Sequence, residues 1–110
     1  MSNDDIAIAK VVYQGVKGVV IQNGCFITCI STPNSLTIPK EIISLEDGCL
    51  SGQDNLEYIH LKHTLQNIGE SVLANCPNLK VIYCSPELEK FSDKLRCGNK
   101  GVIKYVIHNK

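Results

Sequence analysis

The sequence predicts an α/β protein, a short right-handed solenoid of parallel strands and short helices with an N-terminal β-hairpin cap. Three observations lead to this fold. The chain matches itself at a shift of 23 residues, each repeated unit contains a short segment of alternating apolar and polar residues, and the first third is rich in valine and isoleucine around an Asn-Gly pair. With 110 residues, of which 44% are hydrophobic, the chain has the size of one globular domain.

The repeat is clearest in the middle of the chain. Leu45, Ile68 and Phe91 open three successive units at equal spacing. The same shift pairs further apolar positions, namely Leu50 with Leu73, Leu56 with Leu79, Ile59 with Ile82, and Leu65 with Leu88. Partial units flank the two complete copies, because Leu36 and Ile38 align with Ile59 and Leu61, and Tyr105 and Ile107 align with Ile82 and Cys84.

Two kinds of local pattern alternate within each unit. Residues 35–38, 58–61, 81–84 and 104–107 have apolar side chains at their second and fourth positions, which is typical of a half-buried strand. Residues 46–52 and 69–76 have apolar side chains at helical spacing and end at Gly52 or at Asn75-Cys76-Pro77. A strand, a short helix and another strand at constant spacing predict a parallel sheet with right-handed crossovers.

The first 33 residues do not follow the repeat. Ile6 to Tyr13, Gly18 to Gln22 and Cys25 to Ile30 are rich in β-branched residues, and Asn23-Gly24 is a strong two-residue hairpin signal. We expect a β cap over residues 1–33, repeats over residues 34–90, and a partial repeat or C-terminal cap over residues 91–110, all in one domain. Caps are needed because the end units of a stack otherwise expose an apolar face.

The second complete copy resembles a known family. Its run from Ile68 to Ile82, Ile-Gly-Glu-Ser-Val-Leu-Ala-Asn-Cys-Pro-Asn-Leu-Lys-Val-Ile, is similar to the BspA-like, bacterial surface-antigen type of leucine-rich repeat. Leu36-Thr37-Ile38-Pro39 is similar to that family's strand ending. The resemblance covers about residues 34–107, although Gln53 replaces the cysteine in the first copy and the unit from Phe91 lacks the Cys-x-x-Leu close. It implies a leucine-rich-repeat fold, in a family whose better-known members are surface proteins.

Charge and termini bear on partners and location. Lysine and arginine balance aspartate and glutamate at 11 each, so we expect no nucleic-acid partner and no anionic membrane surface. The balance is uneven, since residues 1–79 carry four bases against eight acids, a net of −4, and residues 80–110 carry seven against three, a net of +4. No stretch is long enough for a membrane span and the first residues lack a basic start, which favours the cytoplasm. An extracellular or surface location would require that a signal has been removed.

Local motifs give no support for catalysis, metal binding or a cofactor, and we expect that the protein is not an enzyme. His60 and His63 are expected on opposite faces of a strand end and therefore cannot share one metal ion. Cys25 and Cys29 would lie about 13 Å apart on one strand face, beyond the reach of a disulfide. Cys49, Cys76 and Cys84 fit buried structural positions, and no nucleophile signature surrounds any cysteine.

The outward side chains of the strands are the best candidates for binding. Alternation places the first, third and fifth residue of each strand outside, and the repeat aligns them in columns. The predicted columns are Ser35, Tyr58, Val81 and Lys104; Thr37, His60, Tyr83 and Val106; and Pro39, Lys62, Ser85 and His108. Tyrosines are amphipathic anchors in protein interfaces, so we predict a contact patch on this face. The predicted patch consists of Tyr58, His60, Lys62, Val81, Tyr83 and Val106.

The predicted function is a non-catalytic protein-binding module whose protein partner the sequence does not identify. Exposed tyrosine and valine are also what β-propensity alone selects, which is the competing interpretation of the same face. Three alternatives remain open at this point. They are self-association through exposed sheet edges as a homo-oligomer, a fragment of a surface adhesin, and a small intracellular inhibitor of another protein.

Overall fold

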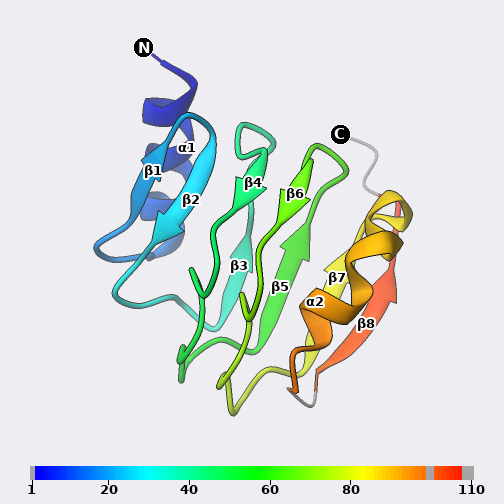
Figure 1. Cartoon of the computed structure of the whole chain (residues 1–110). Helices are drawn as coiled ribbons and strands as arrows, with labels where there is room; N and C mark the ends of the chain where they lie inside the picture. Colours follow the sequence, from blue (N-terminus) through cyan, green and yellow to red (C-terminus); the bar gives the residue numbers. More distant parts are fainter. Residues whose placement is uncertain (1, 99–100, 108–110) are drawn as a thin grey trace.

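The computed structural model describes residues 2–98 and 101–107, which form two four-stranded sheets on opposite sides of one core (Figure 1). The first sheet, called the parallel sheet, has the order β3-β5-β7-β8 and consists of β3 (Ser35–Thr37), β5 (Tyr58–Leu61), β7 (Val81–Cys84) and β8 (Val102–Tyr105). The second, called the hairpin sheet, has the order β1-β2-β4-β6 and consists of β1 (Val20–Gln22), β2 (Cys25–Thr28), β4 (Ser44–Leu45) and β6 (Asn67–Ile68). The α/β class is confirmed, but the two sheets are not parallel throughout, since β1 and β2 are antiparallel.

The parallel sheet confirms the 23-residue register between its first three strands. Ser35 pairs with Tyr58 and Tyr58 with Val81, all in parallel strands. Burial alternates along β5 and β7, so that Ile59, Leu61, Ile82 and Cys84 are fully buried. The outward positions of these strands are therefore held in columns by the backbone pairing.

The register of the last strand was predicted wrongly. β8 pairs Val81 with Val102 and Ile82 with Ile103, a shift of 21 residues instead of 23. A slip of two residues keeps every side chain on its predicted face, because the side-chain period of a strand is two. It nevertheless leaves Ile107, which we expected to be buried, 78% exposed beyond the end of the strand.

The two helices predicted inside the repeats are also wrong. Residues 47–52 and 70–75 form successive turns, and each is preceded by a two-residue strand, β4 or β6, that the sequence did not indicate. In the segment 47–52, alternate backbone amides form hydrogen bonds to the next copy of the repeat. Gly48 N donates to Glu70 O at 2.9 Å, and Gly52 N donates to Ala74 O at 2.9 Å. Hydrogen bonds between copies thus replace those that a helix would make along its own axis.

Left-handed backbone explains why no helix forms there. Gly48 and Gly52 have φ of 64° and 75°, and the residues 23 positions later, Ser71 and Asn75, have φ of 56° and 58°. A right-handed helix requires negative φ at every residue, so these two positions interrupt it in both copies. The glycines of the first copy adopt this conformation without a steric cost, and asparagine tolerates it better than most residues.

The N-terminal segment begins with a helix, so the predicted cap of strands alone was wrong. Helix α1 (Asn3–Gln14) begins at a capping box, in which Ser2 Oγ accepts from Asp5 N at 3.1 Å and Ser2 N donates to Asp5 Oδ2 at 3.4 Å. It ends at Gly15, whose φ is 110°, and buries Ala7 and Val11, four residues apart. The predicted hairpin at Asn23-Gly24 is confirmed, with positive φ at both turn residues.

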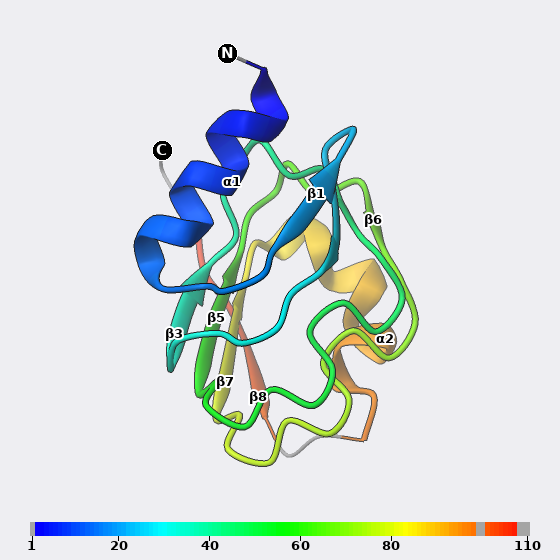
Figure 2. The same ribbon diagram turned by 90° about the vertical axis from the view of Figure 1, so that its left-hand side faces the viewer.

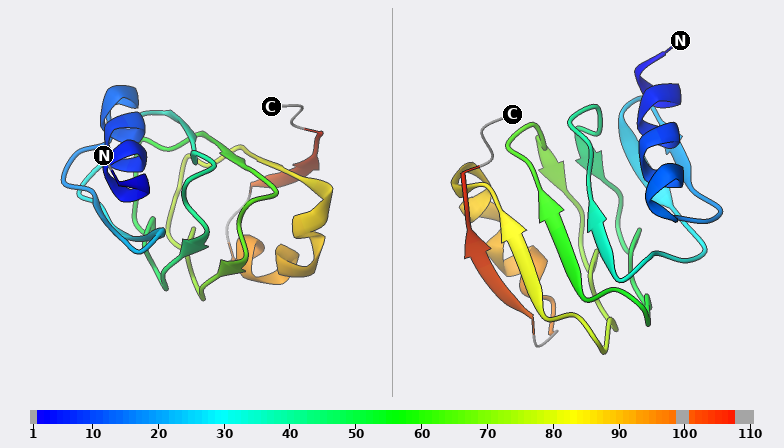
Figure 3. Two further views of the ribbon diagram at one scale, coloured as in Figure 1. Left: turned by 90° about the horizontal axis from the view of Figure 1, so that it is seen from above. Right: turned by 180° about the vertical axis from the view of Figure 1, so that it is seen from behind.

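Helix α1 covers one end of the stack (Figure 3). It is fastened to the hairpin turn, because the two Asp4 carboxylate oxygens accept from Asn23 N and Gly24 N at 2.7 Å each. The 3₁₀ helix η1 (Pro86–Phe91) and helix α2 (Ser92–Arg96) lie beyond β6 near the other end (Figure 2). They bury Leu88 and Leu95 in place of a further short strand, which accounts for the changed spacing before β8.

Candidate functional site

The outward face of the parallel sheet carries a cluster of three rings, called the aromatic cluster and formed by Tyr58, His60 and Tyr83. The imidazole of His60 stacks on the ring of Tyr83 with centroids 4.6 Å apart and planes 14° apart. The rings of Tyr58 and Tyr83 have centroids 6.5 Å apart and are tilted by 31°. All three side chains are half-buried, so the cluster is held in place by its own contacts and still presents ring surface to solvent.

The pairing of β5 with β7 explains this arrangement. His60 and Tyr83 are direct register partners on adjacent parallel strands, and Tyr58 lies two residues before His60 on the same face. Strands are about 4.8 Å apart in the hydrogen-bonding direction, which is close to the stacking distance of two rings. The structure therefore brings together Tyr58, His60, Val81 and Tyr83, as the sequence predicts.

Two predicted columns need correction at their last member. Val102 lies beside Val81, and Lys104 lies beside Tyr83, where the sequence placed Lys104 and Val106 respectively. Val106 follows the end of β8, and its amide donates to Cys84 O at 2.9 Å. His108, expected in the third column, lies outside the described residues.

Positive charge borders the aromatic cluster. The Lys80 ammonium lies 6.0 Å from the centroid of the Tyr58 ring and 3.6 Å from a Glu57 carboxylate oxygen. Lys104 is exposed beside Tyr83 on the neighbouring strand. Because the Lys80 side chain is exposed, its ion pair with Glu57 and its contact with the Tyr58 ring are weak interactions that orient the charge rather than stabilise the fold.

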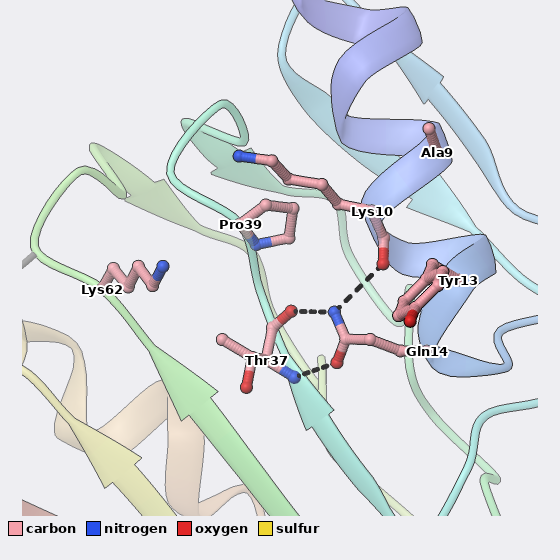
Figure 4. Close-up of a pocket in the computed structure, with 7 residues that line it drawn as sticks. All are labelled: Ala9, Lys10, Tyr13, Gln14, Thr37, Pro39 and Lys62. Carbon is pink, nitrogen blue, oxygen red and sulfur yellow. Dashed lines mark hydrogen bonds between the residues drawn. The ribbon is translucent and has the colours of Figure 1, made fainter.

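A groove continues this face toward helix α1 (Figure 4). Its volume is about 490 Å³, and its walls are formed by Ala9, Lys10, Tyr13 and Gln14 of α1 together with Thr37, Pro39 and Lys62 of the sheet side. Tyr13 is 93% exposed, which is unusual for a large aromatic side chain. Lys62 belongs both to the predicted patch and to this groove.

Gln14 closes the outer edge of β3 inside the groove. Its Nε2 donates to Thr37 O at 2.8 Å, and Thr37 N donates to its Oε1 at 2.8 Å. The side-chain amide thus satisfies the two backbone groups that an added strand would use. A partner that reaches this side of the sheet must bind through side chains and not by extending the sheet at Thr37.

The charges at the groove are unequal. Lys10 is neutralised by Glu41, whose carboxylate oxygens accept from Lys10 Nζ at 3.0 and 3.1 Å. Burial alone would raise the pKa of Glu41, but the hydrogen bond from Lys10 and the positive charges of Lys10 and Lys40 lower it. Lys62 has no carboxylate within ion-pair distance among residues 2–98 and 101–107. The unpaired positive charge that lines the groove therefore comes from Lys62.

Sequence reasoning missed the four residues that α1 contributes to the groove. Ala9, Lys10 and Tyr13 fall in the segment Ile6 to Tyr13, which we expected to belong to a β cap because of its valines and isoleucines, and Gln14 directly follows it. The overlooked signal is Ser2-x-x-Asp5 before an apolar run, followed by Gly15, which together mark a helix with both ends capped.

Burial affects four of the six cysteines. Cys49, Cys76 and Cys84 lie in the core, which confirms the structural positions expected for them. Burial raises the pKa of Cys29 and of Cys84 to about 11, and it also raises the pKa of Cys49 and Cys76. Thiols with raised pKa values carry little thiolate at neutral pH and are poor nucleophiles. Within the described part of the chain, His, Cys, Asp and Glu side chains form no group of three suited to a metal ion.

Comparison with known proteins identifies the repeat. A family model described as "BspA type Leucine rich repeat region (6 copies)" matches residues 12–107. Searches of curated proteins and of solved structures gave no match. None of the helices in the described segments has the length and apolar character required to cross a membrane. The match spans the hairpin, both complete repeats and the strand that follows them, and the chain belongs to the BspA-type leucine-rich repeat family.

Proposed function

We propose that the chain is a non-catalytic protein-binding module, built as a right-handed solenoid that contacts a protein partner through the outward face of its parallel sheet. Membership of a leucine-rich repeat family suggests a protein-interaction module. The aromatic cluster is the observation that supports the outward face of the parallel sheet as the contact surface. In this cluster the rings of His60 and Tyr83 stack with centroids 4.6 Å apart and remain partly open to solvent. Preordered aromatic rings lose little conformational entropy when a partner covers them.

The proposed contact residues follow the predicted patch with one change of register. Tyr58, His60, Val81 and Tyr83 form its centre, and Lys62 lies at the end next to the groove. Val102 and Lys104 extend it on β8, and Val106 lies at its margin. The test is the affinity of a purified partner for a variant that lacks the rings of Tyr58 and Tyr83.

Self-association is a second candidate, favoured by the open edge of β8. Among residues 2–98 and 101–107 this strand has a neighbour on one side only, and Val102 on its outward face is 56% exposed. The segment 80–110 has a net charge of +4, and the segment 1–79 has a net charge of −4, so opposite ends of two copies attract each other.

Light scattering at low and high salt tests this second candidate. An oligomer held by charge is expected to show a mass above 12.1 kDa at low salt and to dissociate as the ionic strength rises. A mass of one chain under both conditions, at a protein concentration of about 100 μM or more, would exclude it.

We also infer a reducing compartment, which favours an intracellular protein such as an inhibitor of another protein over a surface adhesin fragment. Cys25, Cys29, Cys49, Cys76 and Cys84 are thiols in the structure, and exported proteins usually pair their cysteines. The measurement is the number of reactive thiols in protein denatured directly from its native cells. Disulfides in that material would favour the surface alternative.

A further inference from the structure

The groove beside helix α1 has the features of a site for a particular kind of peptide segment. It is open to solvent and has a volume of about 490 Å³, within the range of about 300 to 1,000 Å³ that is usual for binding sites. Its walls are mainly apolar, with the ring of Tyr13 on the helix side and Pro39 on the sheet side, and Figure 4 shows the Lys62 side chain beyond Pro39. A peptide with an apolar side chain and a nearby carboxylate would match the apolar walls and the positive charge of Lys62.

We infer that this groove binds an extended acidic segment of the protein partner, with an apolar side chain between Tyr13 and Pro39 and a carboxylate on Lys62. This inference rests on the proposed function and names the chemistry of the partner. Two charged side chains line the groove, Lys10 and Lys62, and Lys10 is paired with Glu41 at 3.0 Å. Because Glu41 already holds Lys10, an added carboxylate pairs with Lys62 and displaces no existing ion pair.

The geometry of β3 limits how such a segment binds. Gln14 occupies both backbone groups of Thr37 that face α1, so the segment cannot add to the sheet there as another strand. It crosses the strands instead, from the groove over Thr37 to His60 and Tyr83. These three residues are consecutive register partners in β3, β5 and β7, so the groove and the aromatic cluster form one continuous track.

The test uses two synthetic probes, both acetylated and amidated eight-residue peptides. One alternates glutamate and leucine, and the other alternates lysine and leucine. Binding is followed by chemical-shift changes of the ¹⁵N-labelled protein and by calorimetry. We expect the acidic peptide to shift the amides of Tyr13, Gln14 and Lys62, and we expect the basic peptide to shift none of them.

Three single variants separate the groove from the rest of the face. Tyr13→Ala is expected to weaken the acidic peptide about tenfold, and Lys62→Met, which keeps most of the aliphatic side chain, about threefold with a smaller salt dependence. Lys17→Met, which removes the same charge from an exposed residue that does not line the groove, should change the affinity less than twofold. Because Tyr13 is 93% exposed, its truncation leaves the fold unchanged.

Two outcomes would overturn the inference. No binding of the acidic peptide at about 2 mM would contradict it, and so would shifts confined to the basic segment 80–110 or to Tyr58 and Tyr83. Failure of the proposed function has a different signature, because it appears as an unchanged affinity of the whole partner for the variant without the rings of Tyr58 and Tyr83.

Discussion

Gly69→Ala is expected to lower the free energy of unfolding by about 3 kcal/mol, the largest change in stability among the substitutions proposed for this chain. A Cβ atom at this position would lie 2.6 Å from Asp47 N and 2.9 Å from Asp47 Cα, and closer still to Asp47 Oδ1. The first two are backbone atoms of the preceding copy and cannot rotate away. Equilibrium unfolding in urea, monitored by circular dichroism, measures the difference.

The close approach at Gly69 results from the stacking of copies. Gly69 N donates to Leu45 O at 2.8 Å, and Glu70 N donates to Asp47 Oδ1 at 2.8 Å. These hydrogen bonds hold the start of the turn segment 70–75 against the start of the equivalent turn segment 47–52 in the preceding copy. The Ile-Gly opening of the repeat is therefore explained by the contact between copies, and not by the local conformation of the glycine, whose φ is not positive.

Glu46→Ala is the matched control, because Glu46 occupies the equivalent position 23 residues earlier. The segment beneath it is strand β2, where Glu46 N donates to Phe26 O at 3.0 Å, and a Cβ is already accommodated. We expect a change within about 0.5 kcal/mol. The double variant Asp47→Ala/Gly69→Ala should remain as unstable as Gly69→Ala alone. Recovery of stability in the double variant would mean that the carboxylate, and not the backbone, causes the clash.

The double variant Tyr58→Ala/Tyr83→Ala is expected to weaken binding of the partner by about 100-fold or more. Truncation of a tyrosine at the centre of an interface is expected to cost more than about 1.4 kcal/mol of binding free energy, which corresponds to a tenfold increase in the dissociation constant. Removal of Tyr83 also takes away the surface on which His60 stacks at 4.6 Å. Calorimetric titration with the partner, first isolated by affinity capture from the native cells, measures the loss.

A control is needed to distinguish lost contacts from lost structure. Both tyrosines are half-buried on the outward face, so the double variant should keep its circular dichroism spectrum and lose about 1 kcal/mol of stability. Ile30→Ala removes an apolar side chain that is 78% exposed and lies outside both sheets, and it should leave the affinity unchanged. If the folded double variant binds the partner as tightly as the wild type, the strand face is not the contact surface.

The binding face itself could be predicted from the sequence to a large extent. Alternation of apolar residues selects which side chains of Tyr58 to Leu61 and Val81 to Cys84 point inward, and the 23-residue shift sets their alignment. Both signals are local or periodic, so they can be recognised in the sequence without knowledge of the tertiary structure. The groove could not be predicted in the same way, because its two walls come from segments that are distant in the chain, namely α1 and the ends of β3 and β5.

The sequence by itself determined the repeat, the inward and outward faces of the strands and the hairpin at Asn23-Gly24, because each depends on side-chain period or on the chemistry of two turn residues. Tertiary structure decided the rest. Turns replaced helices at residues 47–52 and 70–75 because amides there bond to the next copy, as Gly48 N does to Glu70 O. The β8 register slipped by two residues because η1 and α2 bury Leu88 and Leu95 over a shorter path than a full repeat. Helix α1 placed Tyr13 beside the sheet because its buried residues, Ala7 and Val11, pack at the spacing of a helix and not of a strand.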